Sequence, residues 1–364
     1  MKVIVNKKEI VDFLISFIDH TPYCQTIKMT EENIGESIYY VLEEKSKRKF
    51  DIKKMRKKLK DKIRRGVQRD LEIYVENIKT TIQHRKTFYH NLISKNLDNV
   101  LSIIGEEAIL EKFKKSNCNS FVRSSGLILD PNATFIRRND YTDNTEDCFF
   151  RNMEGNEEML LNKMDNNLPF WFIDTGYTNF LNGKKKTWHR LTRNHLHQVN
   201  VFDAPVDRLG MFEFFPQQWR TPGEKILVIE PGQFSAKTFN VDISKWRYNI
   251  EKEIRQYSDK PIVFREKIPK KRRSSLFKEL QDEDYYCLIN INSNAAIEGI
   301  WSGIPVITLH KHISNPVSRN KISDINNLYR PHLANWLCML SYSQFTQEEI
   351  MNGTAINIVR KFYV

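Results

Sequence analysis

The segment from Tyr285 to Leu309, YYCLININSNAAIEGIWSGIPVITL, constrains the fold more than any other part of the chain. Its first residues, 285–291, are aromatic and aliphatic and too few for a core helix, which predicts a short buried strand. This strand is followed by a polar turn, a run of good helix formers at 295–301, a Ser-Gly pair that ends the helix and a second apolar strand at 304–309. The segment therefore predicts a strand-helix-strand crossover of a parallel α/β sheet.

The polar turn Asn292-Ser293-Asn294 is the first candidate binding site. It follows the carboxyl end of its strand, which is the edge where ligands bind in open parallel sheets. Free backbone N–H groups and the positive end of the helix dipole attract phosphates there. We therefore expect Ser293 and Asn294 to contact a diphosphate, and Glu298, about one turn into the helix, to reach a ribose hydroxyl.

Strands and helices alternate regularly from residue 224 to this crossover. The sequence predicts strands at 225–232 and 261–266 and helices at 242–257 and 274–281. Such alternation indicates a parallel sheet, in which the carboxyl ends of all strands share one edge. Basic side chains also follow these two strands, and they are Lys237, Arg265 and Lys267. We expect them to join the polar turn in binding a phosphate-bearing ligand.

The residues SNAAIEGIWSGIPVI (293–307) resemble the nucleotide-sugar half of GT-B glycosyltransferases, especially those of the capsule-polysaccharide type. Further stretches are similar to a glycosyltransferase group found in phages and bacteria, namely WHRLTRN (188–194), WRTPGEKILVIEP (219–231), Asp324-Ile325 and 333–355. The resemblance spans roughly residues 169–355. It implies an α/β fold of two Rossmann-like halves, and a basic residue after the second strand, here Arg265 or Lys267, that faces the donor phosphates.

Asp174 closes the predicted strand of PFWFIDTGY (169–177). A carboxylate after a mostly apolar strand and before Thr-Gly is expected at the rim of the cleft between the two halves. We predict that it is the general base that deprotonates the acceptor hydroxyl. The alternative is an Asx turn or a helix cap. The resembled group often has Asp-His-Gly-Tyr here, and Thr175 replaces the His in this chain.

The segment WHRLTRNHLHQ (188–198) is rich in arginine and histidine. His195 and His197 alternate as on a strand, which is compatible with two metal ligands, but no further ligand stands at a supporting spacing. We therefore predict no bound metal, as the resembled GT-B class also implies. Arg190 and Arg193 are candidates for contact with a phosphate of the substrate or of a nucleic acid.

Residues 1–115 contain few prolines or glycines and have apolar residues at helical spacing, so we predict a helical region there. Within it, residues 45–69 carry 14 Lys or Arg around one apolar stripe, which is typical of an amphipathic basic helix. The net charge of the chain is +12, which favours a polyanionic partner. The candidate contacts are Lys53, Lys57, Lys60 and Arg64. The alternative is a solvated helix face in a lysine-rich protein.

The chain of 364 residues is long enough for two or three domains. We predict a basic helical region at 1–115, a first α/β half on the acceptor side at 116–215, a nucleotide-sugar-binding half at 216–332 and crossover helices at 333–364. In the first half, 120–129 and 169–177 are predicted strands and 153–163 a helix. We find no apolar run of about 18 residues and no cleavable leader, and the five cysteines are dispersed. These features favour a cytoplasmic protein, which would lie in the cytoplasm of the host cell if a phage encodes it.

Together these expectations predict a glycosyltransferase that moves a sugar from a nucleotide-sugar donor to an acceptor hydroxyl. A UDP-sugar is the first candidate for the donor, and no further cofactor is expected. The basic region favours DNA with a hydroxymethylated base as the acceptor, because such a polyanion would bind it strongly. One alternative acceptor is a surface polysaccharide. Another interpretation is a non-catalytic nucleic-acid-binding protein that retains a nucleotide-sugar fold.

Overall fold

The computed structural model describes residues 1–20, 87, 89–116, 120–142, 145–181, 187–266 and 275–363. The described chain forms two compact units. Unit 1 consists of Met1–Val3, Ser124–Thr134 and Thr142–Val364, and unit 2 of Ile4–Arg123 and Phe135–Tyr141. The basic segment 45–69, with Lys53, Lys57, Lys60 and Arg64, lies outside the described residues.

The sheet predicted from the Tyr285–Leu309 segment is present and entirely parallel. Its four strands are β6 (Lys225–Ile229), β7 (Ile262–Arg265), β8 (Tyr285–Asn290) and β9 (Val306–Thr308), in the order β7-β6-β8-β9. The chain runs outward from β6 to β7 and then returns past β6 to form β8. This change of direction creates a topological switch point between the carboxyl ends of β6 and β8.

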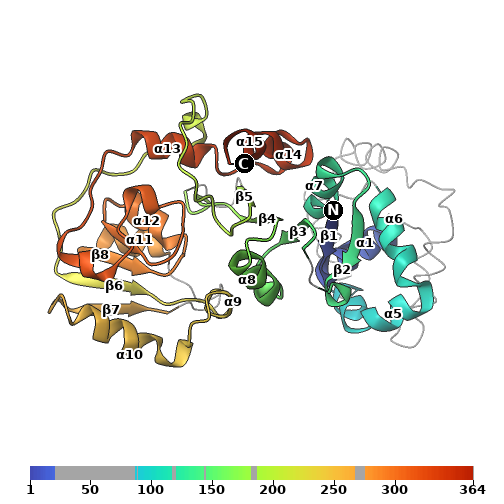
Figure 1. Ribbon diagram of the computed structural model, residues 1–364, viewed down its shortest axis with the longest axis horizontal. Helices are drawn as coiled ribbons and strands as arrows, with labels where there is room; N and C mark the ends of the chain where they lie inside the picture. The colour runs from blue at the N-terminus through green and yellow to red at the C-terminus, as the bar shows by residue number, and fades with distance from the viewer. Residues whose placement is uncertain are drawn as a thin grey trace, which may run out of the picture. The chain divides into compact units, whose positions relative to one another are not determined.

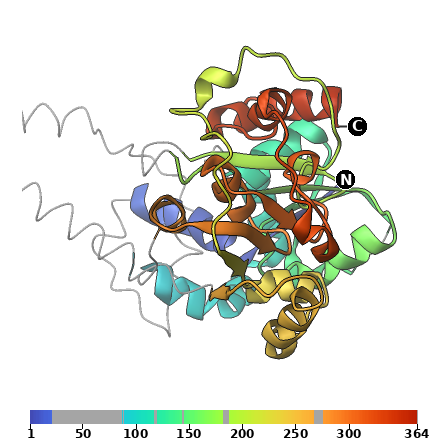
Figure 2. The same cartoon turned by 90° about the vertical axis from the view of Figure 1, so that its left-hand side faces the viewer.

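Helices cover both faces of this sheet because successive side chains of a strand point to opposite faces. Ile226 and Val228 of β6 pack on α10 (Ile243–Ile254), whereas Leu227 packs with α11 (Leu276–Asp282) and α12 (Ala295–Trp301). Figures 1 and 2 show α10 on the opposite side of the sheet from α11 and α12. The result is a half with three layers, α/β/α, in which the carboxyl ends of the four strands lie along one edge of the sheet.

The other sheet contains both parallel and antiparallel strand pairs. Its strands are β1 (Lys2–Val5), β2 (Thr134–Arg137), β3 (Cys148–Arg151), β4 (Phe170–Thr175) and β5 (His189–Arg193), in the order β2-β1-β3-β4-β5. β1, β3 and β4 run parallel, with α8 (Glu157–Asp165) connecting β3 to β4, and β5 pairs antiparallel with β4. The predicted α/β fold with two Rossmann-like halves is thereby confirmed.

Residues 120–129, which we predicted as a strand, form the helix α7 (Phe121–Leu129) instead. Phe121, Val122, Ser125 and Gly126 are buried, and this spacing is that of a helix rather than the period of two of a strand. A Cβ atom added at Gly126 would lie 2.6 Å from Val3 Cγ2, so α7 packs closely on β1 at that position. The first residues of the chain also differ from the prediction, because 2–5 form a strand and not part of a helix.

Unit 2 contains helices around an aromatic core. They are α1 (Lys7–His20), α5 (Leu97–Ile104) and α6 (Glu106–Lys115). The ring of Phe113 contacts those of Phe13 and Phe135 edge-on, with centroids 5.4 and 5.8 Å apart. Arg137 in this unit pairs with three carboxylates, those of Asp98, Glu106 and Asp140. No helix in the described ranges is long and apolar enough to cross a membrane.

The carboxy-terminal segment contacts both halves of unit 1. It forms α13 (Ala334–Ser341), α14 (Gln347–Met351) and α15 (Thr354–Phe362). Trp336 and Leu340 of α13 belong to the same core as α11 and α12, whereas the backbone of Phe345 pairs with that of His189 in β5. Thr346 and Glu349 form a capping box at the start of α14.

Candidate active site

A cleft of about 600 Å³ opens within unit 1, where the carboxyl ends of strands from both sheets meet. From the first sheet it is lined by Asp174 and Thr175 at the end of β4, and by Arg190 of β5. From the second sheet it is lined by residues 229–232 after β6 and 291–295 after β8. The second group surrounds the switch point, the place where open α/β sheets bind their ligands.

Side-chain hydrogen bonds shape the turn after β8. The buried Asn290 accepts the N–H of Ser293 on Oδ1 at 2.8 Å and donates from Nδ2 to Thr308 Oγ1 at 3.2 Å. Ser293 Oγ accepts the N–H of Ala295, while Asn292 Oδ1 accepts from Ser235 Oγ of α9 (Gln233–Thr238) at 3.4 Å. Ser235 of α9 and Ser293 of the turn after β8 therefore line the switch point with their hydroxyl-bearing side chains.

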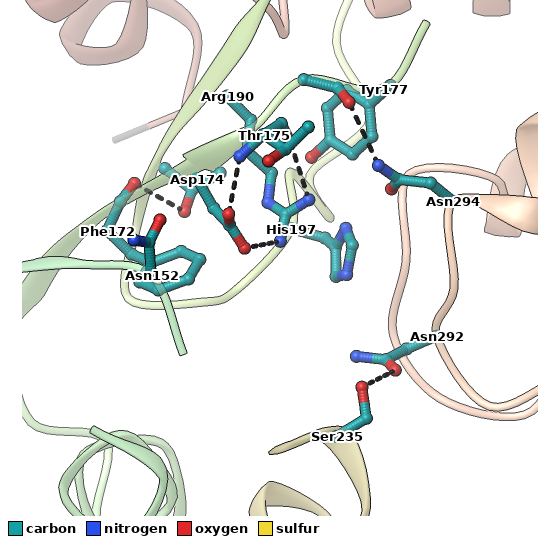
Figure 3. Close-up of polar contacts among 12 residues, drawn as sticks. Asn152, Phe172, Asp174, Thr175, Tyr177, Arg190, His197, Ser235, Asn292 and Asn294 are labelled. Atoms are coloured by element: carbon teal, nitrogen blue, oxygen red, sulfur yellow. Dashed lines mark hydrogen bonds and ion pairs between the residues drawn. The ribbon is translucent and has the colours of Figure 1, made fainter. Parts of the chain in front are cut away.

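Asn294 is the N-cap residue of α12, but its side chain does not cap the helix. Its Nδ2 instead donates to the carbonyl oxygen of Gly176 at 3.1 Å and so joins the loop after β4 to the loop after β8 (Figure 3). α12 has only seven residues, so its macrodipole is small and the polar side chains of the turn matter more for binding.

Asp174 and Arg190 form an ion pair on the cleft wall. The antiparallel register of β4 and β5 places the two residues directly opposite each other. Arg190 donates from Nη2 to Asp174 Oδ2 at 2.9 Å and from Nη1 to the carbonyl oxygen of Thr175 at 3.0 Å, and Asp174 Oδ1 accepts the N–H of Thr175. The Arg190 side chain is 5% exposed and that of Asp174 21%. Each carboxylate oxygen has a second lone pair for a ligand.

The loop that follows Asp174 is held in place from two directions. Gly176 donates its N–H to the carbonyl oxygen of Trp188 at 2.7 Å, and an added Cβ would lie 2.6 Å from Trp188 Cβ. The fully buried Gln344, from the carboxy-terminal segment, accepts the N–H groups of Tyr177 and Thr178 on Oε1 at 2.9 and 3.1 Å. The position of Asp174 at the cleft is therefore fixed by distant parts of the chain.

Buried aromatic and imidazole rings lie beside this ion pair. The rings of His197 and His312 have centroids 4.2 Å apart, and both rings contact Tyr177. The Arg190 guanidinium lies 5.7 Å from the Tyr177 ring centroid. Burial lowers the pKa of His312 to about 3, with Arg190 contributing, so this imidazole is neutral at physiological pH. Across the described stretches no group of three or more His, Cys, Asp or Glu side chains is arranged to hold a metal ion.

The structure brings together six of the eight predicted site residues that it describes. Those that line the cleft are Asp174, Arg190, Arg265, Ser293, Asn294 and Glu298. Arg265 at the end of β7 donates to Glu279 Oε2 at 2.8 Å, which holds its side chain against the cleft wall. Lys237 is exposed on α9 and does not line the cleft, and Arg193 pairs with Asp147 at 2.5 Å. Lys267 lies outside the described residues.

Several cleft residues were not selected from the sequence. They are His197, Ser235, Gly232, Glu230 and Glu266. His197 was noticed only for its alternation with His195, and its place beside Arg190 depends on how the loop after β5 folds back. Ser235 stands in the polar stretch after β6, so the rule that ligands bind at strand ends was sufficient to find it.

Comparison with known proteins adds little to this geometry. No family model matches the sequence, and no curated protein matches it. Among solved structures, the chain is similar to Thermosulfurimonas dismutans KpsC, described as a beta Kdo 2,4 transferase, with a TM-score of 0.35 and 12% sequence identity. The match covers 64% of this chain and 93% of that one. At this level of similarity we draw nothing about function from that protein.

Proposed function

We propose that this protein is a glycosyltransferase that moves a sugar from a nucleotide-sugar donor to an acceptor hydroxyl. The observation that carries the proposal is the cleft in unit 1, which combines a parallel-sheet switch point with a carboxylate on the opposite wall. A switch point is suited to a nucleotide, and a carboxylate is suited to accept a proton. The cleft volume of about 600 Å³ is also in the range of small-molecule sites.

The donor nucleotide would bind at the switch point. Ser235 and Ser293 offer hydroxyls to its phosphates, Arg265 offers a positive charge from the neighbouring strand end, and Glu298 lies on the same wall. Arg265 is also paired with Glu279, so it contributes as a fixed and oriented donor rather than as a mobile cation. Glu298 is our candidate for the residue that binds a ribose hydroxyl of the nucleotide.

The transfer itself needs one proton acceptor and a stabilised leaving group. Asp174 takes the proton of the acceptor hydroxyl, whose oxygen forms the new bond to the anomeric carbon of the sugar. The bond between that carbon and the donor phosphate breaks, and its electron pair leaves with the nucleotide. Arg265 and the hydroxyls at the switch point favour the charge that develops on the leaving phosphate.

The acceptor is proposed from the charge of the sequence. The net charge of +12 and the 14 basic residues in 45–69 support a polyanionic acceptor. DNA carrying a hydroxymethylated base is the first acceptor to test, and an acidic surface polysaccharide is the second. Arg190 and Arg193 are engaged in ion pairs within the protein, so they add little to such an electrostatic attraction.

A thermal-shift panel tests the donor site directly. UDP, GDP, dTDP and CMP, each with a matching sugar nucleotide, are added to the folded protein, and a ligand at about 100 times its Kd adds about 2.7 kcal/mol of stability. We expect one series to raise Tm, Arg265→Ala to reduce that shift, and Lys245→Ala, on the exposed face of α10, to leave it unchanged. A flat panel with folded wild-type protein would overturn the proposed function.

A further inference from the structure

Three cleft-lining side chains each have a buried polar atom without a hydrogen-bond partner within the described chain. The atoms are Arg190 Nε, His197 Nδ1 and Asn294 Oδ1. Buried polar atoms are almost always paired in proteins, because an unpaired one costs about 1–3 kcal/mol. The presence of three such atoms on one cleft therefore points to a bound molecule that pairs with them.

The geometry fixes which hydrogen-bonding role each atom offers. Arg190 uses Nη1 and Nη2 on Thr175 and Asp174, so its Nε–H remains as a donor. Asn294 must present its amide N–H₂ to the carbonyl oxygen of Gly176, so its Oδ1 remains as an acceptor. Arg190 is 5% exposed, so only a ligand seated deep in the cleft would reach its Nε.

His197 offers a ring nitrogen. Its side chain is 3% exposed, and burial together with His312 and Arg190 lowers its pKa well below the usual value, so the ring is neutral and has one N–H. Its Nδ1 has no partner, and this atom is an acceptor in one tautomer of the neutral ring and a donor in the other.

A donor, an acceptor and a neutral ring nitrogen match hydroxyl groups better than a phosphate. Sugar hydroxyls both donate and accept hydrogen bonds, so two or three of them satisfy all three atoms, whereas an ionised phosphate only accepts and leaves Asn294 unpaired. Figure 3 shows Arg190 beside Asp174, the proposed acceptor-side base, with His197 next to Arg190. All three side chains line the same cleft as Ser293, on the proposed phosphate side. A sugar transferred from the donor to the acceptor passes through this cleft.

Resting on the proposed function, we propose that Arg190, His197 and Asn294 form the subsite that binds the hydroxyls of the transferred sugar. In this subsite Asn294 accepts a hydrogen bond from a sugar hydroxyl, Arg190 donates one, and the Nδ1 of His197 pairs with a further hydroxyl. The nucleotide and its phosphates bind at the neighbouring switch point. Removal of the His197 ring nitrogen therefore weakens binding of the sugar nucleotide and leaves binding of the free nucleotide unchanged.

Isothermal titration tests this subsite on the full chain. Wild type and variants are titrated with UDP, GDP, dTDP and CMP and with their matching sugar nucleotides, and the ratio of the two dissociation constants isolates the sugar contribution. We expect the sugar nucleotide to bind more tightly than its free nucleotide in wild type. His197→Leu should reduce that ratio by about 10-fold, which is the loss of about one hydrogen bond.

Two matched variants separate hydrogen bonding from packing. His197→Asn keeps a polar amide close to the position of Nδ1 and should retain most of the sugar contribution. His312→Asn removes the ring that packs on His197 but does not line the cleft, and it should leave the ratio unchanged. Both variants also provide a folded comparison if His197→Leu fails to fold.

The outcomes distinguish this inference from the proposed function. If a sugar nucleotide binds more tightly than its free nucleotide and His197→Leu does not change the ratio, the subsite assignment is wrong while the proposed function stands. If wild type binds sugar nucleotides and free nucleotides equally, the subsite is also wrong. If none of the nucleotides or sugar nucleotides binds wild type, the proposed function fails and the subsite fails with it.

Discussion

Asp174 is the residue whose chemistry can be tested most sharply. Asn at this position has nearly the same shape and keeps one acceptor oxygen, which can bind the guanidinium of Arg190, while the N–H of Thr175 loses its bond to Oδ1. It cannot take a proton from the acceptor. We therefore expect Asp174→Asn to lower kcat by about 10²–10⁴-fold with little change in the Kd of the donor, as measured by steady-state kinetics and titration.

A second carboxylate, that of Asp147 just before β3, provides the control for that variant. Asp147 pairs with Arg193 at 2.5 Å, and neither residue lines the cleft. Asp147→Asn weakens an equivalent ion pair without touching the cleft, so kcat should remain within about twofold of wild type, since such partly exposed pairs contribute little. Equal losses in the two variants would show that Asp174 acts on folding and not on proton transfer.

Gly176 is needed for close packing against Trp188. A Cβ added at Gly176 would lie 2.6 Å from Trp188 Cβ and 2.8 Å from its carbonyl oxygen, and the 2.7 Å hydrogen bond between the two backbones resists a shift. We expect Gly176→Ala to lower the free energy of unfolding by about 1–3 kcal/mol in a urea titration. Gly210→Ala is the control, because no atom lies within 4 Å of its added Cβ. Equal stability of both variants would contradict the packing explanation.

Single residues of the site were predictable where they belong to a local pattern. Ser293 and Glu298 follow from one strand-helix-strand segment, and Asp174 follows from its place at the end of an apolar strand. The pairing of Asp174 with Arg190 was not predictable, because it depends on the register of two strands separated by a loop. His197 was missed for the same reason, since its role arises only when its ring lies beside Arg190 and Asn292.

At the scale of elements, the carboxy-terminal segment supports the loop after β4 through one buried amide. Gln344 Oε1 accepts the N–H groups of Tyr177 and Thr178, and Gln344 Nε2 donates to Thr178 Oγ1 at 2.6 Å. Gln344→Leu leaves two buried N–H groups unpaired, and each costs about 1–3 kcal/mol. We expect the variant to lose at least about 2 kcal/mol of unfolding free energy in urea. Gln347→Leu, exposed on α14, should change it by less than about 0.5 kcal/mol.

A helix or strand is predicted correctly when the residues within it are sufficient to determine where it begins and ends. The helix predicted at 295–301 is α12 (Ala295–Trp301), and the helix predicted at 242–257 is α10, which begins after the N-cap Asp242. The prediction failed at 120–129, where β-branched and aliphatic residues favour a strand in isolation. In the folded chain that segment is a helix because its buried positions face β1 on one side, and this long-range packing overrides the local preference.

At the scale of the whole molecule, the buried histidines make stability depend on pH. Burial lowers the pKa of His312 to about 3 and, with His312 and Arg190 nearby, lowers that of His197 well below the usual value near 6.5. Between pH 6.5 and the folded pKa values, the unfolded chain binds protons that the folded chain does not. Stability is therefore highest above pH 6.5 and falls as the pH decreases. Glu106 in unit 2 acts in the opposite direction, because burial and Asp140 raise its pKa to about 6.

His312→Asn tests this account, because asparagine has no titrating group and still offers an acceptor for the N–H of Ser314, which Nδ1 of His312 now accepts at 3.2 Å. Each histidine held neutral contributes a slope of up to about 1.4 kcal/mol per pH unit below 6.5. We expect the variant to be less stable than wild type at pH 7.5, but its unfolding free energy should fall less steeply between pH 6 and 4.5, by about that amount per unit. Urea midpoints at four or five pH values measure both slopes, and the titration of Glu106 cancels in their difference. Parallel curves would mean that His312 is protonated in the folded state and that the rings of His197 and His312 are not a neutral pair.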